Sequence, residues 1–357
     1  MSEIASPLKI AVVGAGLIGE RHARLITLLS EFELCAIVDP SENAKRIADE
    51  LGIQCFLQLS SFLNGNVDCD GVIIATPNET HRPFAIRCFE KSLPCLIEKP
   101  LAANSEDASA IAEASLKANV AVLVGHHRRH HSVSRILKDK IDQGDLGQMV
   151  GAQLTWMLRK PDDYFKVSEW RIQKGGGPIW INLIHEIDLL RYFLGEIIEV
   201  SAMVSNSVRG NAVEDSGVIN MRCKNGAVIS AILSDATPSP WHFEGGSGEN
   251  PNISETGYGG LRIFGTKGAI EFPSLRHWQH ENNDGHWGKP IHYQENKSSL
   301  SLGGETALTA QLYNFADVIR GVSEPLVSAQ DGVQSVRVVE AIHQSAISGS
   351  LKSISTS

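Results

Sequence analysis

Three glycines, Gly14, Gly16 and Gly19, stand between a short apolar run and a helical pattern. This G-x-G-x-x-G spacing is typical of a turn that binds a dinucleotide. The first glycine makes the turn, the second admits a pyrophosphate to the N–H groups of the helix N-terminus, and the third lets the helix lie close to the sheet. Asp39 ends the next apolar run, 20 positions after Gly19, where a carboxylate can accept hydrogen bonds from both ribose hydroxyls. That carboxylate would repel a 2′-phosphate, and Pro40 follows it in place of Arg or Ser, so the sequence favours NAD over NADP.

A second candidate is His185 in GGGPIWINLIHEID, residues 175–188, a glycine-rich segment that leads into an amphipathic helix. Histidine suits proton transfer near neutral pH, although a lone histidine on an apolar helix face is more often a core residue. At about 100° per residue, Asn182 and Asp188 each lie about 60° from His185 on opposite sides, so either could neighbour the imidazole.

The elements that carry these residues change in character along the chain. Up to about residue 125, short apolar runs alternate with helical patterns, which indicates a parallel sheet with crossover helices. Later segments such as 149–158 and 216–223 alternate apolar and polar residues and indicate an antiparallel sheet with one covered face. We predict an α/β protein: a doubly wound Rossmann domain over 1–125, and an α+β domain with an open, mostly antiparallel sheet over 126–357. The C-terminal helices could pack back on the Rossmann domain.

Composition limits the function classes. The 357 residues are enough for two domains, each with its own core. A net charge of −9 without an extended basic segment argues against nucleic acid and anionic membrane partners. The six cysteines include no CxxC pair, and no His/Asp/Glu cluster has metal-ligand spacing, so we predict neither a disulfide framework nor a metal. An acidic N-terminus and no apolar run of about 18 residues favour the cytoplasm.

Five further segments, spread over almost the whole chain, form an ordered set: GVIIATPNETH (71–81), LIEKPLA (96–102), VGHHRRHHS (124–132), GGGPIWINLIHEIDLLRYFLG (175–195) and IFGTKGAIEFPSL (263–275). The set resembles the glucose–fructose oxidoreductase/inositol dehydrogenase (Gfo/Idh/MocA) family, and Glu98-Lys99-Pro100 is its most specific part. The resemblance implies an NAD(P)-dependent oxidoreductase that acts on a secondary hydroxyl of a sugar, inositol or sugar acid. It also implies a homodimer or homotetramer formed through the C-terminal sheet.

The resemblance assigns roles to individual residues. Lys99 is expected beside the nicotinamide and the substrate hydroxyl, and a lysine at the end of a buried strand does lie at the ligand-binding edge of a doubly wound sheet. Lys99 and His185 would handle the hydroxyl proton, with Asn182 close by. Cofactor contacts are expected at Gly14, Gly16, Leu17, Ile18, Gly19, Asp39, Thr76, Pro77, Asn78, His81, Glu98, Lys99, Trp170 and Arg171. Candidate substrate contacts are His127, Arg128, Trp156, Asn182 and Tyr258.

Several of these assignments have a plainer alternative. His81 could simply pack at the start of a helix, and Trp156 and Tyr258 could be ordinary core or loop aromatics. HHRRHH, residues 126–131, could form a cationic rim at the substrate mouth or a solvated linker between domains.

The chain also departs from the family pattern. An aspartate usually stands four residues before the histidine, but Ile181 occupies that position here, and Leu183 stands where glycine is usual. Asn182 or Asp188 could compensate. The missing carboxylate keeps two alternatives open: a recycled NAD that supports epimerisation, elimination or oxidoisomerisation, and a catalytically silent dinucleotide sensor.

Overall fold

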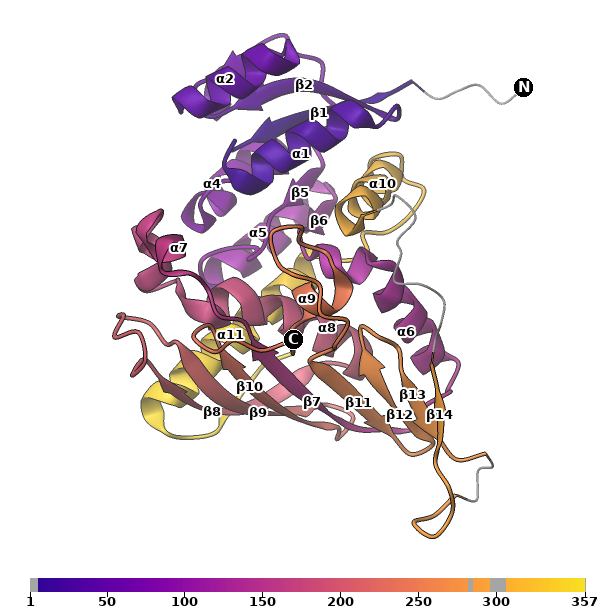
Figure 1. Ribbon diagram of the computed structural model, residues 1–357. Helices are drawn as coiled ribbons and strands as arrows, with labels where there is room; N and C mark the ends of the chain where they lie inside the picture. Colours follow the sequence, from indigo (N-terminus) through magenta and orange to yellow (C-terminus); the bar gives the residue numbers. More distant parts are fainter. Residues whose placement is uncertain (1–5, 282–284, 296–305, 357) are drawn as a thin grey trace, which may run out of the picture. The chain divides into compact units, whose positions relative to one another are not determined.

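The computed structural model describes residues 6–281, 285–295 and 306–356 (Figure 1). The chain forms two compact units. Unit 1 comprises Met1–His127 and Leu308–Val336, and unit 2 comprises Arg128–Ala307 and Arg337–Ser357. We predicted a boundary after residue 125 and allowed the C-terminal helices to pack back on the Rossmann domain. The observed division falls after His127, and residues 308–336 belong to unit 1.

Unit 1 is built on a six-stranded sheet in which every pair of neighbouring strands is parallel. The strand order β3-β2-β1-β4-β5-β6 reverses between β1 and β4, which is the switch point where doubly wound sheets bind ligands. The strands are β1 (Leu8–Val13), β2 (Phe32–Val38), β3 (Cys55–Phe56), β4 (Gly71–Ile74), β5 (Cys95–Ile97) and β6 (Val122–Val124). The Rossmann prediction is confirmed.

Local capping explains where the helices of unit 1 begin and end. In α2, the Ser41 side chain accepts a hydrogen bond from Ala44 N, and Gly52 ends the helix in the left-handed region. In α5, Asn104 and Asn119 have the corresponding roles. The helices are α1 (Leu17–Leu28), α2 (Glu42–Leu51), α3 (Leu59–Leu63), α4 (His81–Phe89), α5 (Ser105–Ala118) and α10 (Ala307–Ile319), with the first residues of α11 (Ala329–Ser348).

Helix α10 packs tightly on the Rossmann sheet. A Cβ on Gly71, the first residue of β4, would lie 2.7 Å from Ile319 Cδ1 and 3.0 Å from the Phe315 ring. This contact explains why a late segment of the chain belongs to unit 1.

Unit 2 contains a nine-stranded sheet in the order β14-β13-β12-β11-β7-β10-β9-β8-β15. Among the strands of the described residues, only the β7–β10 pair is parallel, so the predicted open, mostly antiparallel sheet is confirmed. The strands are β7 (Met149–Met157), β8 (Ile197–Ser205), β9 (Ser216–Cys223), β10 (Val228–Ser234), β11 (Leu261–Gly265), β12 (Gly268–Phe272), β13 (His277–Gln279), β14 (His292–Gln294) and β15 (Lys352–Ser353).

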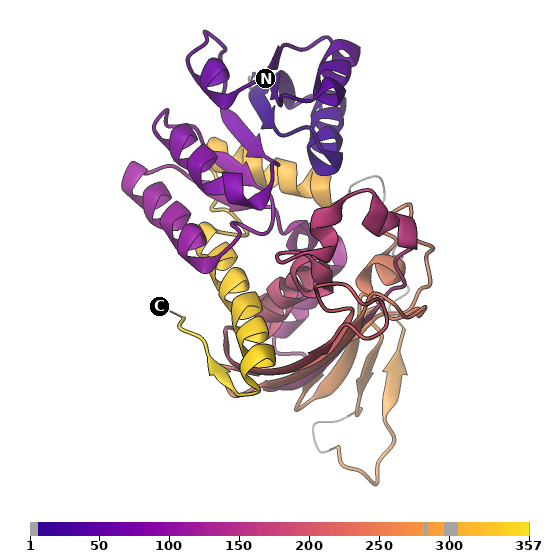
Figure 2. The ribbon, with the colours of Figure 1, turned by 90° about the vertical axis from the view of Figure 1, so that its left-hand side faces the viewer.

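Helices of unit 2 other than α7 cover one face of this sheet (Figure 2). Residues such as Trp156, Ile187, Leu190 and Val339 form the core between the sheet and these helices. The helices are α6 (Ser132–Asp142), α7 (Asp162–Lys166), α8 (Ile184–Leu194), α9 (Phe243–Ser247) and the second part of α11.

The opposite face of the sheet carries a row of exposed apolar side chains. Val218 on β9 is opposite both Met203 on β8 and Ile232 on β10, and the Met203 side chain is 75% exposed. We call Met203, Val218 and Ile232 the apolar row.

Among the described residues, no helix is long and apolar enough to cross a membrane. The cytoplasmic location stays a prediction.

Candidate functional site

The glycine turn of unit 1 has the geometry that a pyrophosphate site requires. Gly14 has φ +92°, and a Cβ there would lie 2.5 Å from the Ala75 carbonyl oxygen. A Cβ on Gly19 would lie 1.9 Å from the Gly14 carbonyl oxygen, so glycine is needed for α1 to start this close to β1. A Cβ on Gly16 would meet no atom within 4 Å, so the turn is open where a phosphate must approach the helix N-terminus. Contacts of Leu17 and Ile18, the first residues of α1, with a cofactor stay predictions.

Asp39 is fixed beside this turn at the end of β2. Its Oδ2 accepts from Ala15 N and its Oδ1 from Ser41 N, both at 2.8 Å. Partial burial raises the pKa of Asp39, but hydrogen bonds from the Ser41 side chain and from the Ala15 and Ser41 N–H groups outweigh it, so the pKa lies below its ordinary value. Asp39 is therefore an ionised acceptor at the edge of the candidate dinucleotide site.

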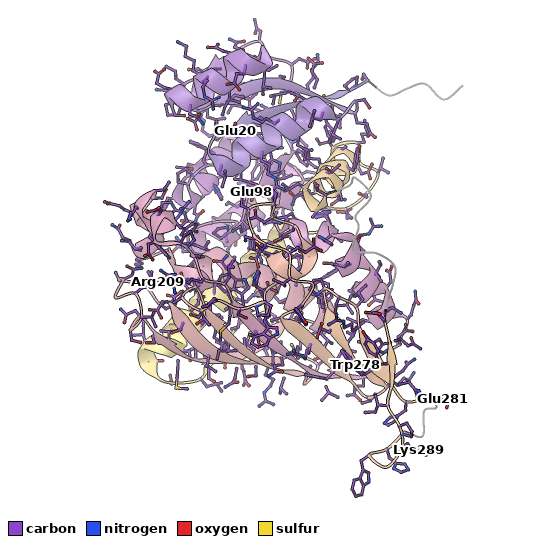
Figure 3. The ribbon with its side chains drawn as sticks, in the orientation of Figure 1. Glu20, Glu98, Arg209, Trp278, Glu281 and Lys289 are labelled. Atoms are coloured by element: carbon purple, nitrogen blue, oxygen red, sulfur yellow. The ribbon has the colours of Figure 1, made fainter. Side chains whose placement is uncertain are left out.

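Glu98, which is labelled in Figure 3, follows β5. It is buried and paired with a residue that the sequence analysis missed. Its Oε1 lies 2.8 Å from Nε2 of His22 on α1, and a Cβ on Gly125 would touch its carboxylate. Burial raises the pKa of Glu98, but the hydrogen bond to His22 and the electrostatic effects of His22, His127 and Lys99 outweigh it and lower the pKa. His22 follows Gly19 by three positions on the helix face that packs on the sheet, and a buried histidine at that place needs a polar partner. The predicted cofactor contact of Glu98 and the predicted substrate contact of His127 are not tested by this geometry.

His81 connects two turns at the same edge of the sheet. Its Nε2 lies 2.9 Å from the Thr76 carbonyl oxygen and its Nδ1 lies 3.1 Å from that of Pro100. Burial lowers the pKa of His81 even though the backbone carbonyls oppose this. Both ring nitrogens face carbonyl oxygens, and a neutral imidazole donates to only one of the two. This buried position inside the protein favours the packing alternative for His81. The turn that it supports carries Thr76, Pro77 and Asn78, and Lys99 is half-buried beside Pro100.

Arg128 is enclosed by carboxylates in unit 2. Its guanidinium contacts Glu186 and Glu249 at 2.6 Å and Glu244 at 2.8 Å, and it stacks on the Phe243 ring. Burial lowers the pKa of Arg128, but the three carboxylates outweigh it and raise the pKa, whereas burial raises the pKa of Glu186 to about 7. The expectations of a solvated linker and of a cationic rim at Arg128 are both wrong, because this guanidinium is buried and already neutralised.

Asp188 is held by the next arginine. Arg129 Nε and Nη2 donate to its two carboxylate oxygens at 2.8 and 2.7 Å, and Arg191 Nη1 lies 3.8 Å away. All three side chains are buried. Asp188 thus serves an ionic contact with Arg129 and Arg191, and its role as a substitute for the missing family aspartate stays a prediction.

The segment before His185 is not a regular α-helix. Residues Ile179–Leu183 form a π-helical turn in which Ile184 N donates to Ile179 O, and α8 begins only after it. The predicted spacing of about 100° per residue therefore fails between Asn182 and His185. Single π turns inside helices are frequent at functional sites. His185 itself is buried on α8, with 8% of its surface exposed.

Asn182 contacts a lysine that the sequence analysis did not single out. Lys160 Nζ donates to Asn182 Oδ1 at 2.6 Å and lies 3.8 Å from Asp235 Oδ2. Only 6% of Lys160 is exposed. Its signal in the sequence was a Lys-Pro pair after an alternating strand segment, which repeats the Lys99-Pro100 arrangement.

Glu214 is a third residue that the sequence analysis missed, and it caps the π-helical turn. Its Oε1 accepts from Ile179 N at 3.0 Å, and a Cβ on Gly177 would lie 2.5 Å from the same oxygen. Burial raises the pKa of Glu214 to about 7. Position 177 therefore has to be glycine, because a Cβ there would collide with the Glu214 carboxyl group.

The predicted aromatic contacts divide into two groups. Trp156 is fully buried and donates from Nε1 to Glu244, which favours a core role. Trp170 and Tyr258 are each about half exposed and accessible to a ligand. Arg171 stacks on the Tyr164 ring at 3.9 Å. Within the described residues, no cluster of His, Cys, Asp or Glu is arranged to hold a metal ion.

Two family models match the chain. Residues 8–126 match "Oxidoreductase family, NAD-binding Rossmann fold", and residues 138–354 match "Oxidoreductase family, C-terminal alpha/beta domain". Among curated relatives, 1,5-anhydro-D-fructose reductase of Ensifer adhaerens is 26% identical over 88% of this chain and 89% of its own length. The scyllo-inositol 2-dehydrogenase (NAD(+)) of Bacillus subtilis is 27% identical over 93% and 92%.

A solved structure supports the same fold. The WlbA dehydrogenase of Bordetella pertussis, in complex with NADH and UDP-GlcNAcA, has a TM-score of 0.77 at 24% identity and covers 98% of this chain and 99% of its own. The two family models, which together match most of the chain, show that the chain belongs to the Gfo/Idh/MocA family of oxidoreductases.

Proposed function

We propose that this oxidoreductase uses NAD to transfer a hydride to or from a secondary hydroxyl-bearing carbon of a sugar, inositol or sugar acid. The observation that carries the proposal is the open glycine turn beside an ionised Asp39. When bound, NAD supplies the hydride chemistry at its nicotinamide ring. The curated relatives named above, a sugar reductase and an inositol dehydrogenase, support the substrate class.

The preference for NAD rests on the charge of Asp39. Its oxygens are oriented by Ala15 and Ser41 and keep lone pairs for the two ribose hydroxyls. A 2′-phosphate would meet this carboxylate at close range, so NADP is disfavoured.

The proposal assigns the hydroxyl proton to Lys99 and His185. Lys99 follows β5 at the sheet edge where doubly wound folds bind ligands. His185 follows the π-helical turn on α8, with Asn182 within that turn. Both side-chain types can donate or accept a proton once a pocket adjusts their pKa values.

We further propose that the protein assembles into a homodimer or homotetramer through the sheet of unit 2. The apolar row offers the kind of exposed apolar surface that marks protein interfaces. A monomer in analytical ultracentrifugation at micromolar concentration would refute this assembly.

The test is a screen of polyols, sugars and sugar acids with NAD, followed by NADH absorbance. K99M and H185A should each abolish turnover while NADH binding stays measurable by fluorescence. Lys166→Met is the matched control, because this lysine side chain is 74% exposed and should tolerate the change. Unchanged turnover in K99M or H185A would refute the assignment.

The same screen separates the alternatives. Stoichiometric NADH release identifies a dehydrogenase, whereas product formation without NADH release identifies a recycled cofactor. Turnover of any candidate substrate excludes the silent sensor.

A further inference from the structure

The contact between Lys160 and Asn182 determines which atoms Asn182 can offer to a ligand. Lys160 follows β7 and its ammonium group can only donate hydrogen bonds. The Asn182 atom at 2.6 Å from Lys160 Nζ must therefore be the carbonyl oxygen Oδ1. This fixes the amide plane, and the NH₂ group becomes the part of Asn182 that remains to bind a partner.

Nothing else holds that NH₂ group in the described part of the chain, where the only hydrogen bond of the Asn182 side chain is the one from Lys160. Asn182 is also partly exposed. The π-helical turn thus presents a donor group one position after the place where the family usually has an acceptor carboxylate.

Surrounding groups keep Lys160 in this position. Asp235 lies 3.8 Å from Nζ, and the faces of Tyr164 and Trp156 lie 4.9 and 5.7 Å away. Arg209 in turn donates from Nε to Asp235 at 2.7 Å, and Figure 3 labels Arg209. Carboxylate charge and aromatic faces both stabilise a buried ammonium group. The pair is therefore a built arrangement and not a chance surface contact.

We propose that Lys160 is a positioning residue that locks the Asn182 amide with its NH₂ group directed at the substrate, so that the enzyme selects a sugar acid over the matching neutral sugar. A carboxylate at this position would accept a bond from a substrate hydroxyl, whereas an NH₂ donor with an ammonium behind it prefers an anionic acceptor. This inference rests on the proposed oxidoreductase function and narrows its substrate class.

The first experiment tests the lock without any substrate. In ¹H–¹⁵N spectra of the whole protein, the Asn182 side-chain NH₂ signals are those that disappear in N182A. K160M should shift these signals and increase their exchange with water, while K166M should leave them unchanged. Asn182 signals that do not respond to K160M would overturn the lock.

The second experiment tests the selectivity with D-glucuronate against D-glucose and D-galacturonate against D-galactose. The wild type should show a kcat/KM at least tenfold higher for the acid of the preferred pair. K160M should raise KM for the acid at least tenfold with a smaller effect on kcat. The double variant K160M/N182A should lower kcat/KM for the acid little more than either single variant does, because the two residues act as one unit.

Asn182→Asp keeps the shape but replaces the donor by an acceptor, so it tests the idea even if K160M perturbs folding. The ratio of kcat/KM for the acid to kcat/KM for the neutral sugar should be at least tenfold lower in N182D than in the wild type. A purely structural role of Lys160 would lower the melting temperature and leave the acid-to-neutral ratio unchanged, which would overturn the proposal.

Different results would overturn the oxidoreductase function and the selection of a sugar acid. If no compound in the broader screen is turned over, the oxidoreductase proposal fails, and the inference about substrate selection fails with it even if the spectra show the lock. If neutral sugars are turned over as well as acids, the inference fails while the oxidoreductase proposal stands.

Discussion

Replacing Glu214 by glutamine should remove a pH-dependent loss of stability from unit 2. Burial raises the Glu214 pKa from 4.5 to about 7. A carboxyl group whose pKa rises on folding binds its proton more tightly in the folded chain, so stability is greatest at low pH and falls as the pH rises from about 4.5 to about 7. One pKa unit corresponds to about 1.4 kcal/mol, so the full loss is about 3 kcal/mol, of which about 2.5 kcal/mol falls between pH 5 and 8.

The glutamine variant keeps the acceptor for Ile179 N but cannot ionise. The free energy of unfolding of E214Q minus that of the wild type should therefore increase by about 2 to 3 kcal/mol between pH 5 and pH 8. E214Q thus becomes more stable relative to the wild type as the pH rises. Glu186 also has a raised pKa, but it titrates in both proteins and cancels in the difference.

Urea unfolding followed by tryptophan fluorescence suits this measurement. All six tryptophans of the chain lie between residues 156 and 287, within unit 2, so the signal reports the unit that contains Glu214. Glu255→Gln, an exposed change in the same unit, is the control and should give a difference that stays flat with pH. An E214Q difference that is equally flat would show that burial does not raise the pKa of Glu214 above the opposing effects of Lys160 and Ile179 N.

Two further predictions concern the dinucleotide site. Gly19→Ala places a Cβ 1.9 Å from a backbone oxygen, so it should destabilise unit 1 by about 3 kcal/mol and weaken NADH binding. At Gly16 the added Cβ meets no atom within 4 Å, so G16A should keep the melting temperature and only raise the NADH Kd. Equal melting temperatures for both variants would contradict the close contact at Gly19. Asp39→Ser removes a charged acceptor worth about 1.5 to 3 kcal/mol, so the ratio of the NADPH and NADH Kd values should fall by roughly 10- to 100-fold in fluorescence titrations. An unchanged ratio would show that Asp39 does not select the cofactor.

The dinucleotide site could be predicted from the sequence because its geometry is local. Gly14, Gly16 and Gly19 lie within one turn, and Asp39 follows in the next strand of the same βαβ unit. The alternation of apolar runs with helical patterns was enough to predict the Rossmann sheet. The alternation of apolar and polar residues after residue 126 was enough to predict the open sheet.

The side-chain partners could not be predicted because they are distant in sequence. Arg128 meets Glu249 across 121 positions, and only the folded chain shows that this arginine is buried among carboxylates. Asn182 meets Lys160 across 22 positions. The direction of Asn182 was also obscured because helix periodicity assumes an α-helix, whereas the chain forms a π-helical turn there.

The π-helical turn affects how this protein can be redesigned. It is wider than an α-helical turn, so positions 181 and 185, four residues apart, stay on the same side of the helix, whereas Asn182, three residues before His185, turns further away from it. Writing the common family aspartate into position 181 would therefore return a carboxylate to the side of the helix that carries His185, without any insertion or deletion.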